Sequence, residues 1–261
     1  MSNDYLTYMA ILPVILLLLF IYKRDTHKEP KKLLRKTFIF GCLTVIPVII
    51  VELIFEVVFK IYGDDTQIMK FASIFIGVAL VEELFKWLVV RFIPYKDTEF
   101  DEKYDGIVYA VFSSLGFAVI ENLLYCLNSN ISVAILRALT AVPGHACDAV
   151  VMGYFLGLAK YYAINENKKL ENKNLFFAIL FPVITHTIYD YLLTAGIPLL
   201  SIIWLIFVIV FTIICFILVI KSSKSNIYLQ KKNSSVYCKN CGNYVEGKRY
   251  CSKCGERTSN E

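Results

Sequence analysis

Residues 198–220 read PLLSIIWLIFVIVFTIICFILVI, a run of 23 residues without a charged side chain. At 1.5 Å per residue, an α-helix of this length spans about 34 Å, which is enough to cross the roughly 30 Å hydrocarbon core of a bilayer. The whole chain of 261 residues is 57 % hydrophobic, with a mean hydropathy of +0.58. Soluble domains are less apolar than this, so the sequence predicts an all-α polytopic membrane protein.

Six further apolar runs precede this one along the chain. We expect the seven transmembrane helices at residues 5–22, 37–59, 68–93, 105–127, 132–161, 174–194 and 198–220. The first run has its charged flank after it and shows no small-residue cleavage site, which favours a retained anchor over a cleaved signal peptide. We therefore expect one membrane domain over residues 1–221, followed by a flexible polar linker at residues 222–236.

Positive charges in the connecting loops predict the orientation. The segment 23–36, the residues around Lys168 and the tail after residue 220 are rich in Lys and Arg. Three alternate loops carry no positive charge, at residues 63–65, 128–130 and 195–197. The positive-inside rule therefore predicts a multi-pass protein of the cell membrane, with its N-terminus outside and its C-terminal tail in the cytoplasm.

The eight cysteines fall into two groups. Four lie singly in apolar runs, where cysteine behaves as a small hydrophobic residue. The other four form two C-x-x-C-G knuckles within residues 237–256, at Cys238, Cys241, Cys251 and Cys254. This spacing predicts a structural Zn²⁺ ribbon, because four thiolates leave no open position for water. Two disulfides are the alternative, which a cytoplasmic location disfavours.

The net charge of +5 belongs mainly to the tail. Residues 221–261 hold nine Lys and Arg against three Glu, so the preceding part of the chain is nearly neutral. The charge therefore does not argue for nucleic acid as a partner. The ribbon resembles those appended to many bacterial membrane proteins, and this resemblance implies a structural or interaction module that binds a cytoplasmic protein.

Ionisable residues inside an apolar run are costly in a bilayer and usually functional. The third run contains Glu82, Glu83 and Lys86. Lys86 lies one turn from Glu82 and can pair with it, which leaves Glu83 about 100° around the helix. Adjacent carboxylates in an apolar helix suit general-base chemistry. An ion pair at the membrane interface is the structural alternative.

The second run also carries charged side chains, at Glu52, Glu56 and Lys60. Glu56 and Lys60 are four residues apart and predict an ordinary ion pair near the outer interface. Glu52 lies deeper in the run, and its role stays open.

Carboxylates and imidazoles recur in three later runs. Glu121 and Asn122 are adjacent in the fourth run, and His145 follows a Pro-Gly pair that we expect to bend the fifth. In the sixth run, Asp190 lies four residues after His186, so it shares a helix face with the imidazole and can fix its tautomer. Two of the three histidines thus lie in apolar runs with acidic partners, which indicates one intramembrane site.

Together these elements resemble the PrsW family of intramembrane proteases, which belongs with the CAAX-protease-like superfamily of glutamate-dependent membrane peptidases. The resemblance covers residues 68–194. It rests on four motifs. E-E-x-x-K matches Glu82, Glu83 and Lys86, and F-x-x-x-E-N matches Phe117, Glu121 and Asn122. The first histidine element matches His145, and H-x-x-x-D matches His186 and Asp190. It implies an endopeptidase that cleaves a membrane-anchored protein, such as an anti-sigma factor, in a bacterial membrane. The ribbon is an addition to the family pattern.

The residues allow two versions of the mechanism. Glu82 or Glu83 would activate a water for attack on a peptide carbonyl, and His145 and His186 would orient that water or stabilise the oxyanion. Asn122 is a further candidate donor to the oxyanion. In the second version, the histidines and carboxylates hold a catalytic zinc. The absence of an H-E-x-x-H motif favours the version without a metal.

Two other function classes also use such residues. A proton-coupled transporter needs buried carboxylates and histidines, but it more often shows repeat symmetry, which this sequence lacks. A receptor or scaffold would use the ribbon to recruit a cytoplasmic partner. Substitution of the membrane carboxylates separates these readings, because it abolishes proteolysis in an enzyme and spares recruitment by a scaffold.

The orientation can be tested with reporter fusions. A reporter fused after Lys224 should be active only if it is of the kind that works in the cytoplasm, because the last loop charges place this end inside. The same reporter fused at Gly196 should be silent. Activity after Lys224 of a reporter that works only outside the cell would refute the orientation.

Overall fold

The computed structural model describes residues 4–62, 66–127, 129–224, 229, 240–241, 251 and 253–256. Its membrane part is all helical, as the sequence predicts. The elements in chain order are α1 (Asp4–Arg24), α2 (Lys31–Leu43), α3 (Val45–Tyr62), α4 (Gln67–Ala72), the π-helix η1 (Ser73–Ala79), α5 (Leu80–Phe92), the 3-10 helix η2 (Pro94–Lys96), α6 (Asp105–Leu127), α7 (Ile131–Leu139), α8 (Ala141–Ile164), α9 (Lys168–Thr194) and α10 (Pro198–Lys224).

Six helical stretches of the described chain are long and apolar enough to cross a membrane. They coincide with six of the seven expected spans. The remaining expected span, the third in chain order at residues 68–93, is built from α4, η1 and α5, none of which reaches the needed length alone. This segment also carries the densest group of ionisable residues. Composition and length therefore detect the other six spans more readily than the one that holds the E-E-x-x-K motif.

Two spans are broken at a threonine that lies three residues before a proline. α2 gives way to α3 at Thr44, before Pro47, and α7 gives way to α8 at Thr140, before Pro143. A proline ring clashes with the carbonyl four residues earlier, which is the last residue of the preceding helix in both cases. The bend expected from Pro143-Gly144 is therefore confirmed, and it falls one turn earlier, at Thr140, where φ is −128°.

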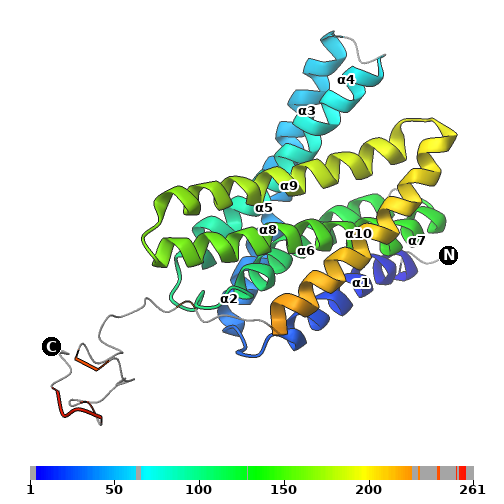
Figure 1. Cartoon of the computed structure of the whole chain (residues 1–261). Helices are drawn as coiled ribbons and strands as arrows, with labels where there is room; N and C mark the ends of the chain where they lie inside the picture. Colours follow the sequence, from blue (N-terminus) through cyan, green and yellow to red (C-terminus); the bar gives the residue numbers. More distant parts are fainter. Residues whose placement is uncertain are drawn as a thin grey trace.

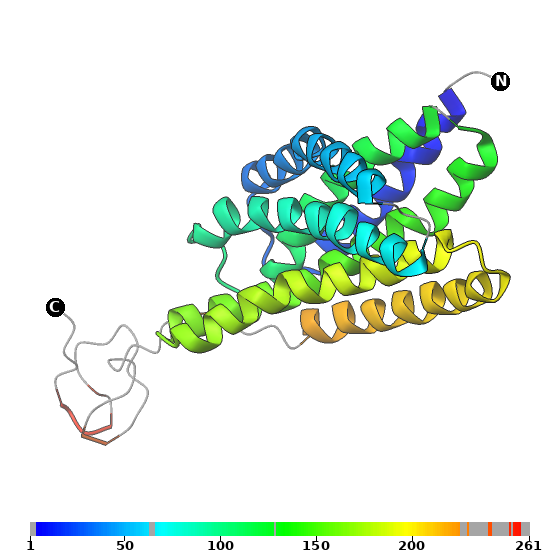
Figure 2. The same ribbon diagram turned by 90° about the horizontal axis from the view of Figure 1, so that it is seen from above.

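α6 is the central helix of the bundle. It packs against α1, α2 and α8 (Figure 1). Of its most apolar stretch, 72 % is buried inside the protein, compared with 17 % for α1 and α10. α9 and α10 lie side by side along one edge of the bundle (Figure 2). The outer helices therefore present most of their surface to lipid, while α6 and its neighbours form the core.

The exposed surface of the outer helices is apolar. Large aliphatic side chains point outward along α3 and α10, including Leu53, Ile54, Val57, Ile202, Ile206 and Ile213. In water such a surface would be strongly unfavourable, whereas lipid tails solvate it at no cost. α3 and α4 extend beyond the other helices at one end of the bundle (Figure 1).

Close backbone contact holds α6 against α8. A Cβ on Gly153 would lie 2.4 Å from the carbonyl oxygen of Gly106 and from Cα of Ile107. A Cβ on Gly106 would lie 2.3 Å from the carbonyl oxygen of Gly153. Small residues are what allow membrane helices to approach in this way. The contact sets the separation between the two helices that carry Glu121 and His145.

Substitution of Gly153 by alanine should therefore destabilise the bundle. The new methyl group meets backbone atoms that cannot rotate away, and overpacking of this kind typically costs about 1–3 kcal/mol. Thermal unfolding of the purified protein in detergent measures the loss. Gly144→Ala on the same helix is the matched control, because its Cβ would meet nothing closer than 3.9 Å. Equal stability of the two variants would contradict the close-contact argument.

Candidate active site

The E-E-x-x-K motif lies in the first two turns of α5, directly after the π-helix η1. Glu82, Glu83 and Lys86 are 4 %, 0 % and 0 % exposed. The Lys86 ammonium donates to Glu82 Oε2 at 2.9 Å and to Glu83 Oε1 at 2.7 Å. The expected pairing of Lys86 with Glu82 is confirmed, and the same ammonium also neutralises Glu83. A buried cation between two carboxylates is a stable arrangement only because each charge is directly paired.

His186 on α9 connects this motif to the sixth span. Its Nδ1 lies 3.0 Å from Glu83 Oε1, and its Nε2 lies 3.3 Å from Asp190 Oδ2. The helical spacing from His186 to Asp190 therefore places the carboxylate beside the ring as expected. The imidazole is held between two carboxylates and cannot rotate freely.

His145 on α8 approaches the motif from the other side. Its Nδ1 lies 3.1 Å from the Lys86 ammonium, which has no lone pair and must be the donor. The proton of this imidazole is therefore on Nε2, which donates to Glu121 Oε2 at 2.9 Å. The rings of His145 and His186 are 5.6 Å apart between centroids, with an interplanar angle of 85°. Both imidazoles thus carry a carboxylate on Nε2 and turn Nδ1 toward α5.

A second polar layer supports Glu121. Arg137 on α7 donates through Nη2 to Glu121 Oε2 at 2.9 Å and through Nε to Asn122 Oδ1 at 2.8 Å. The Asn122 amide nitrogen donates to the carbonyl of Ala10 on α1 at 3.3 Å. Asn122 is 0 % exposed, and both ends of its amide are occupied. This residue therefore positions Arg137, and one of the two N–H groups of its amide is already used.

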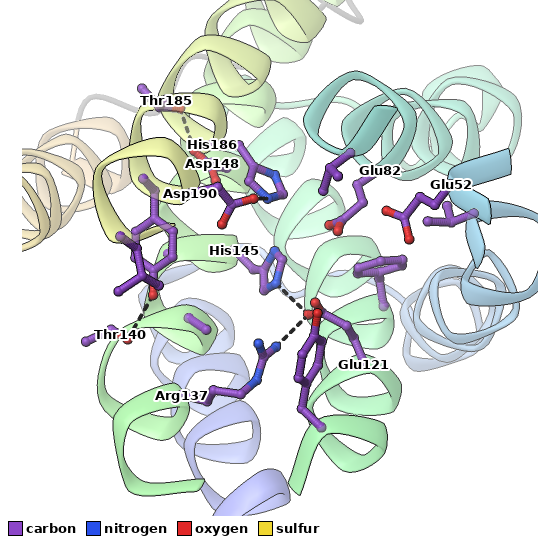
Figure 3. Close-up of a pocket in the computed structure, with 18 of the residues that line it drawn as sticks. Glu52, Glu82, Glu121, Arg137, Thr140, His145, Asp148, Thr185, His186 and Asp190 are labelled. Atoms are coloured by element: carbon purple, nitrogen blue, oxygen red, sulfur yellow. Dashed lines mark hydrogen bonds and ion pairs between the residues drawn. The ribbon is translucent and has the colours of Figure 1, made fainter. Parts of the chain in front are cut away.

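A cavity of about 520 Å³ opens beside these residues, between α3, α5, α6, α7, α8, α9 and α10 (Figure 3). Five of the predicted site residues line it, namely Glu82, Glu121, His145, His186 and Asp190. Glu83 and Asn122 do not line it. The two adjacent glutamates therefore differ in access, since Glu82 faces the cavity and Glu83 lies behind it.

Further polar side chains line the cavity that the sequence did not assign to the site. Glu52, Asp148 and Tyr189 are among them. Figure 3 shows Glu52 of α3 pointing toward Glu82 of α5. Asp148 lies one helical turn after His145, so its spacing was a usable signal. Glu52 offered only its depth in an apolar run. By contrast, the expected ion pair of Glu56 and Lys60 is confirmed as an exposed contact of 2.5 Å.

The four residues closest together can hold a metal ion. Glu82, Glu83, His145 and His186 each offer a ligand atom, and these atoms lie within 4.8 Å of one another. Two imidazoles and two carboxylates are ligands suited to zinc-class ions. A carboxylate on the far nitrogen of each ring is the usual support of a metal-binding histidine. Glu83 Oε2 is also buried without a hydrogen-bond partner. The residues present therefore fit a metal.

The described part of the predicted ribbon brings three cysteines together. Cys241, Cys251 and Cys254 offer sulfur atoms within 4.8 Å of one another. Gly255 follows the second knuckle with φ of +73°, the left-handed conformation that a tight turn beneath a metal requires. The cluster can bind a metal ion. Cys238, the fourth predicted ligand, lies outside the described residues.

Comparison with known proteins shows which family the chain resembles. A family model described as "PrsW family intramembrane metalloprotease" matches residues 29–219, a wider range than the motifs cover. Protease PrsW of Oceanobacillus iheyensis is 40 % identical over 184 residues, which cover 70 % of this chain and 80 % of the relative. Protease PrsW of Bacillus subtilis is 34 % identical over 187 residues, covering 71 % and 81 % respectively. No solved structure matches the chain.

The contact between Arg137 and Glu121 should contribute measurably to stability. In a double-mutant cycle of Arg137→Gln and Glu121→Gln, we expect a coupling on the order of 1–3 kcal/mol, because each single change leaves a partly buried charge unpaired. The matched control is the cycle of Glu56→Gln and Lys60→Gln at an exposed pair, where we expect about 0.5 kcal/mol or less. Thermal unfolding in detergent measures both. Equal couplings would show that Arg137 does not hold Glu121.

Proposed function

Because the chain belongs to the PrsW family of intramembrane metalloproteases, we propose that it cleaves a membrane-anchored protein with Glu82 as the general base. The protein is an intramembrane protease, as its family and its 34–40 % identical relatives establish. The transporter and scaffold readings lose their support. What remains to be assigned is the role of each residue, the metal, and the substrate.

The choice between the two glutamates rests on one observation. Glu82 lines the cavity, whereas Glu83 is fully buried between Lys86 and His186. A general base must come within hydrogen-bond reach of the water that it deprotonates. Glu82 meets this condition directly. Glu83 instead holds Lys86 and His186 in place and acts through them.

The two imidazoles occupy the opposite wall of the same cavity. Their Nδ1 atoms face α5, so His145 and His186 are placed to orient the attacking water through these atoms. Asp190 and Glu121 keep the rings in position through their contacts with Nε2. In this proposal, Asn122 stabilises the site through Arg137 and makes no contact with substrate.

Two of these residues would hold the catalytic metal of this family. His145 and His186 are its proposed ligands, while Glu83 keeps His186 in position and Glu82 stays free to act as the base. When bound, such an ion supplies a Lewis acid that activates water and polarises a carbonyl. The ammonium of Lys86 already neutralises the two glutamates beside this donor set. The version without a metal is no longer preferred.

The substrate follows from the surroundings of the cavity. Its walls include apolar side chains of the outer helices, such as Leu53, Phe207 and Phe211, beside the polar cluster. A volume of about 520 Å³ accommodates a short stretch of extended chain. We propose a protein with a membrane-spanning segment as substrate, of which an anti-sigma factor is one example. The zinc ribbon would serve as an accessory domain that binds a cytoplasmic partner.

The decisive test compares isosteric variants of the two glutamates. The full chain, purified in detergent and loaded with zinc, is incubated with a single-span membrane-anchored substrate, and cleavage is followed on gels. Glu82→Gln should lose cleavage roughly a hundredfold or more, because amide cannot accept the proton of the water. Glu83→Gln should also lose cleavage, accompanied by a lower thermal stability, because it leaves Lys86 only one carboxylate.

Glu56→Gln is the matched control and should cleave normally, because Glu56 also lines the cavity but is 55 % exposed and paired with Lys60. The assignment of the base to Glu82 fails if Glu82→Gln retains cleavage while Glu83→Gln abolishes it in a stably folded protein. Loss in both variants with full stability in both would place Glu83 in the chemistry as well.

A further inference from the structure

A second group of carboxylates lies at the other end of α6, on the side of the basic loops. Asp25, Glu29, Glu102 and Asp105 are 3 %, 5 %, 2 % and 0 % exposed. They come from the segment after α1, the segment before α6 and the first residue of α6. Asp105 is sixteen residues from Glu121, or about 24 Å along the helix. The group is therefore distinct from the protease site.

The hydrogen bonds of this group leave two oxygens without partners. Asp105 Oδ2 accepts the backbone N–H groups of Asp101 and Glu102 at 2.9 and 2.7 Å. Asp25 Oδ1 accepts the N–H of His27 at 3.2 Å. Asp25 Oδ2 and Asp105 Oδ1 are buried and have no hydrogen-bond partner among the described residues. Buried polar atoms of this kind normally find a partner, so each calls for a ligand.

One basic side chain of the same loops, His27, pairs with a carboxylate of this group, and two others contact different groups. Lys28 donates to the backbone carbonyls of Tyr22 and Asp25. Lys103 lies over the ring of Tyr161, 4.0 Å from its centroid. The imidazole of His27 contacts Glu102.

The burial of these carboxyl groups changes their pKa values. Desolvation raises the pKa of Glu29 to about 7 and also raises the pKa of Asp25. The Tyr109 hydroxyl donates to Glu29 and offsets only part of this effect. The buried oxygens of Asp25 and Asp105 that lack a hydrogen-bond partner among the described residues can be satisfied by a proton or by a cation.

We propose that Asp25, Glu102 and Asp105 bind a hard divalent cation of the Mg²⁺ or Ca²⁺ class. Each of the three residues offers an oxygen, and these oxygens lie within 4.8 Å of one another. Oxygens around Ca²⁺ at about 2.4 Å lie at most about 4.8 Å apart, so the present spacing already suits a common ion. Oxygen donors alone select hard cations, whereas the protease site and the ribbon offer nitrogen or sulfur.

Such an ion would join two parts of the fold. Asp25 directly follows α1, and Asp105 begins α6, the central helix that carries Glu121 at its far end. The ion would hold the two segments at a common point near the membrane surface. Its role is therefore structural, and it is independent of the peptide-cleaving chemistry.

Binding of Mn²⁺ tests the site. The full-length protein is freed of metals with a chelator in detergent, and Mn²⁺ is titrated while the signal of free Mn²⁺ is followed by electron paramagnetic resonance. The experiment uses the background Glu82→Gln with His186→Ala, which weakens the protease site. We expect one Mn²⁺ to remain bound in this background and to be displaced by excess Mg²⁺ or Ca²⁺.

Asp25→Asn and Glu102→Gln should each weaken this binding roughly tenfold or more, because each removes a charged ligand. Glu99→Gln, an exposed residue of the same loop, is the matched control and should bind as the background does. Thermal unfolding without metal identifies any variant that fails to fold, and the other variant then decides.

Two results would overturn the proposal. The first is the absence of any bound Mn²⁺ that Mg²⁺ or Ca²⁺ displaces. The second is undiminished binding in the folded Asp25→Asn and Glu102→Gln variants. In either case protons alone neutralise the group. Neither result bears on the assignment of Glu82, because the protease site is already disabled in the background used.

Discussion

The ammonium of Lys86 is fully buried in a bundle that spans a bilayer, where an uncompensated charge is strongly unfavourable. Its three donors are directed at Glu82, Glu83 and His145, so one cation orders side chains from α5 and α8. Through Glu83 the same charge also reaches His186 on α9. The positions of α5, α8 and α9 are thus constrained by the requirement that a single buried charge be satisfied. The cavity lies beside this point because Glu82 keeps one side open to it.

Much of this arrangement could be predicted from the sequence. Charged residues in apolar runs have few stable positions, so E-E-x-x-K, His145 and H-x-x-x-D had to turn inward and meet. The spacing from His186 to Asp190 correctly placed the carboxylate on the imidazole, because helix periodicity determines that contact locally. Six of the seven expected spans coincide with helices long and apolar enough to cross a membrane, whereas residues 68–93 are divided among α4, η1 and α5.

Other features depend on packing between distant helices and could not be read from local patterns. Which of two adjacent glutamates faces the cavity depends on the rotation of α5 against α6 and α9. The role of Glu52 depends on how α3 approaches α5. The break at Thr140 could have been derived, because a proline disturbs the turn before it and not its own position. The carboxylates at 25–29 and 102–105 lay in loops, where charge is ordinarily solvated, so their burial gave no signal in the sequence.

The close contact of Gly106 with Gly153 fixes α6 and α8 relative to each other at one point. Along α8, His145 lies eight residues from this contact, and along α6, Glu121 lies fifteen residues from it. One inserted residue in either interval would move everything beyond it by about 1.5 Å and turn it by about 100°. Glu121 and His145 would then face different directions while both helices remained intact. The lengths of these two intervals are therefore as much a part of the enzyme as the side chains at their ends, and point substitution should be tolerated there far better than a change in length.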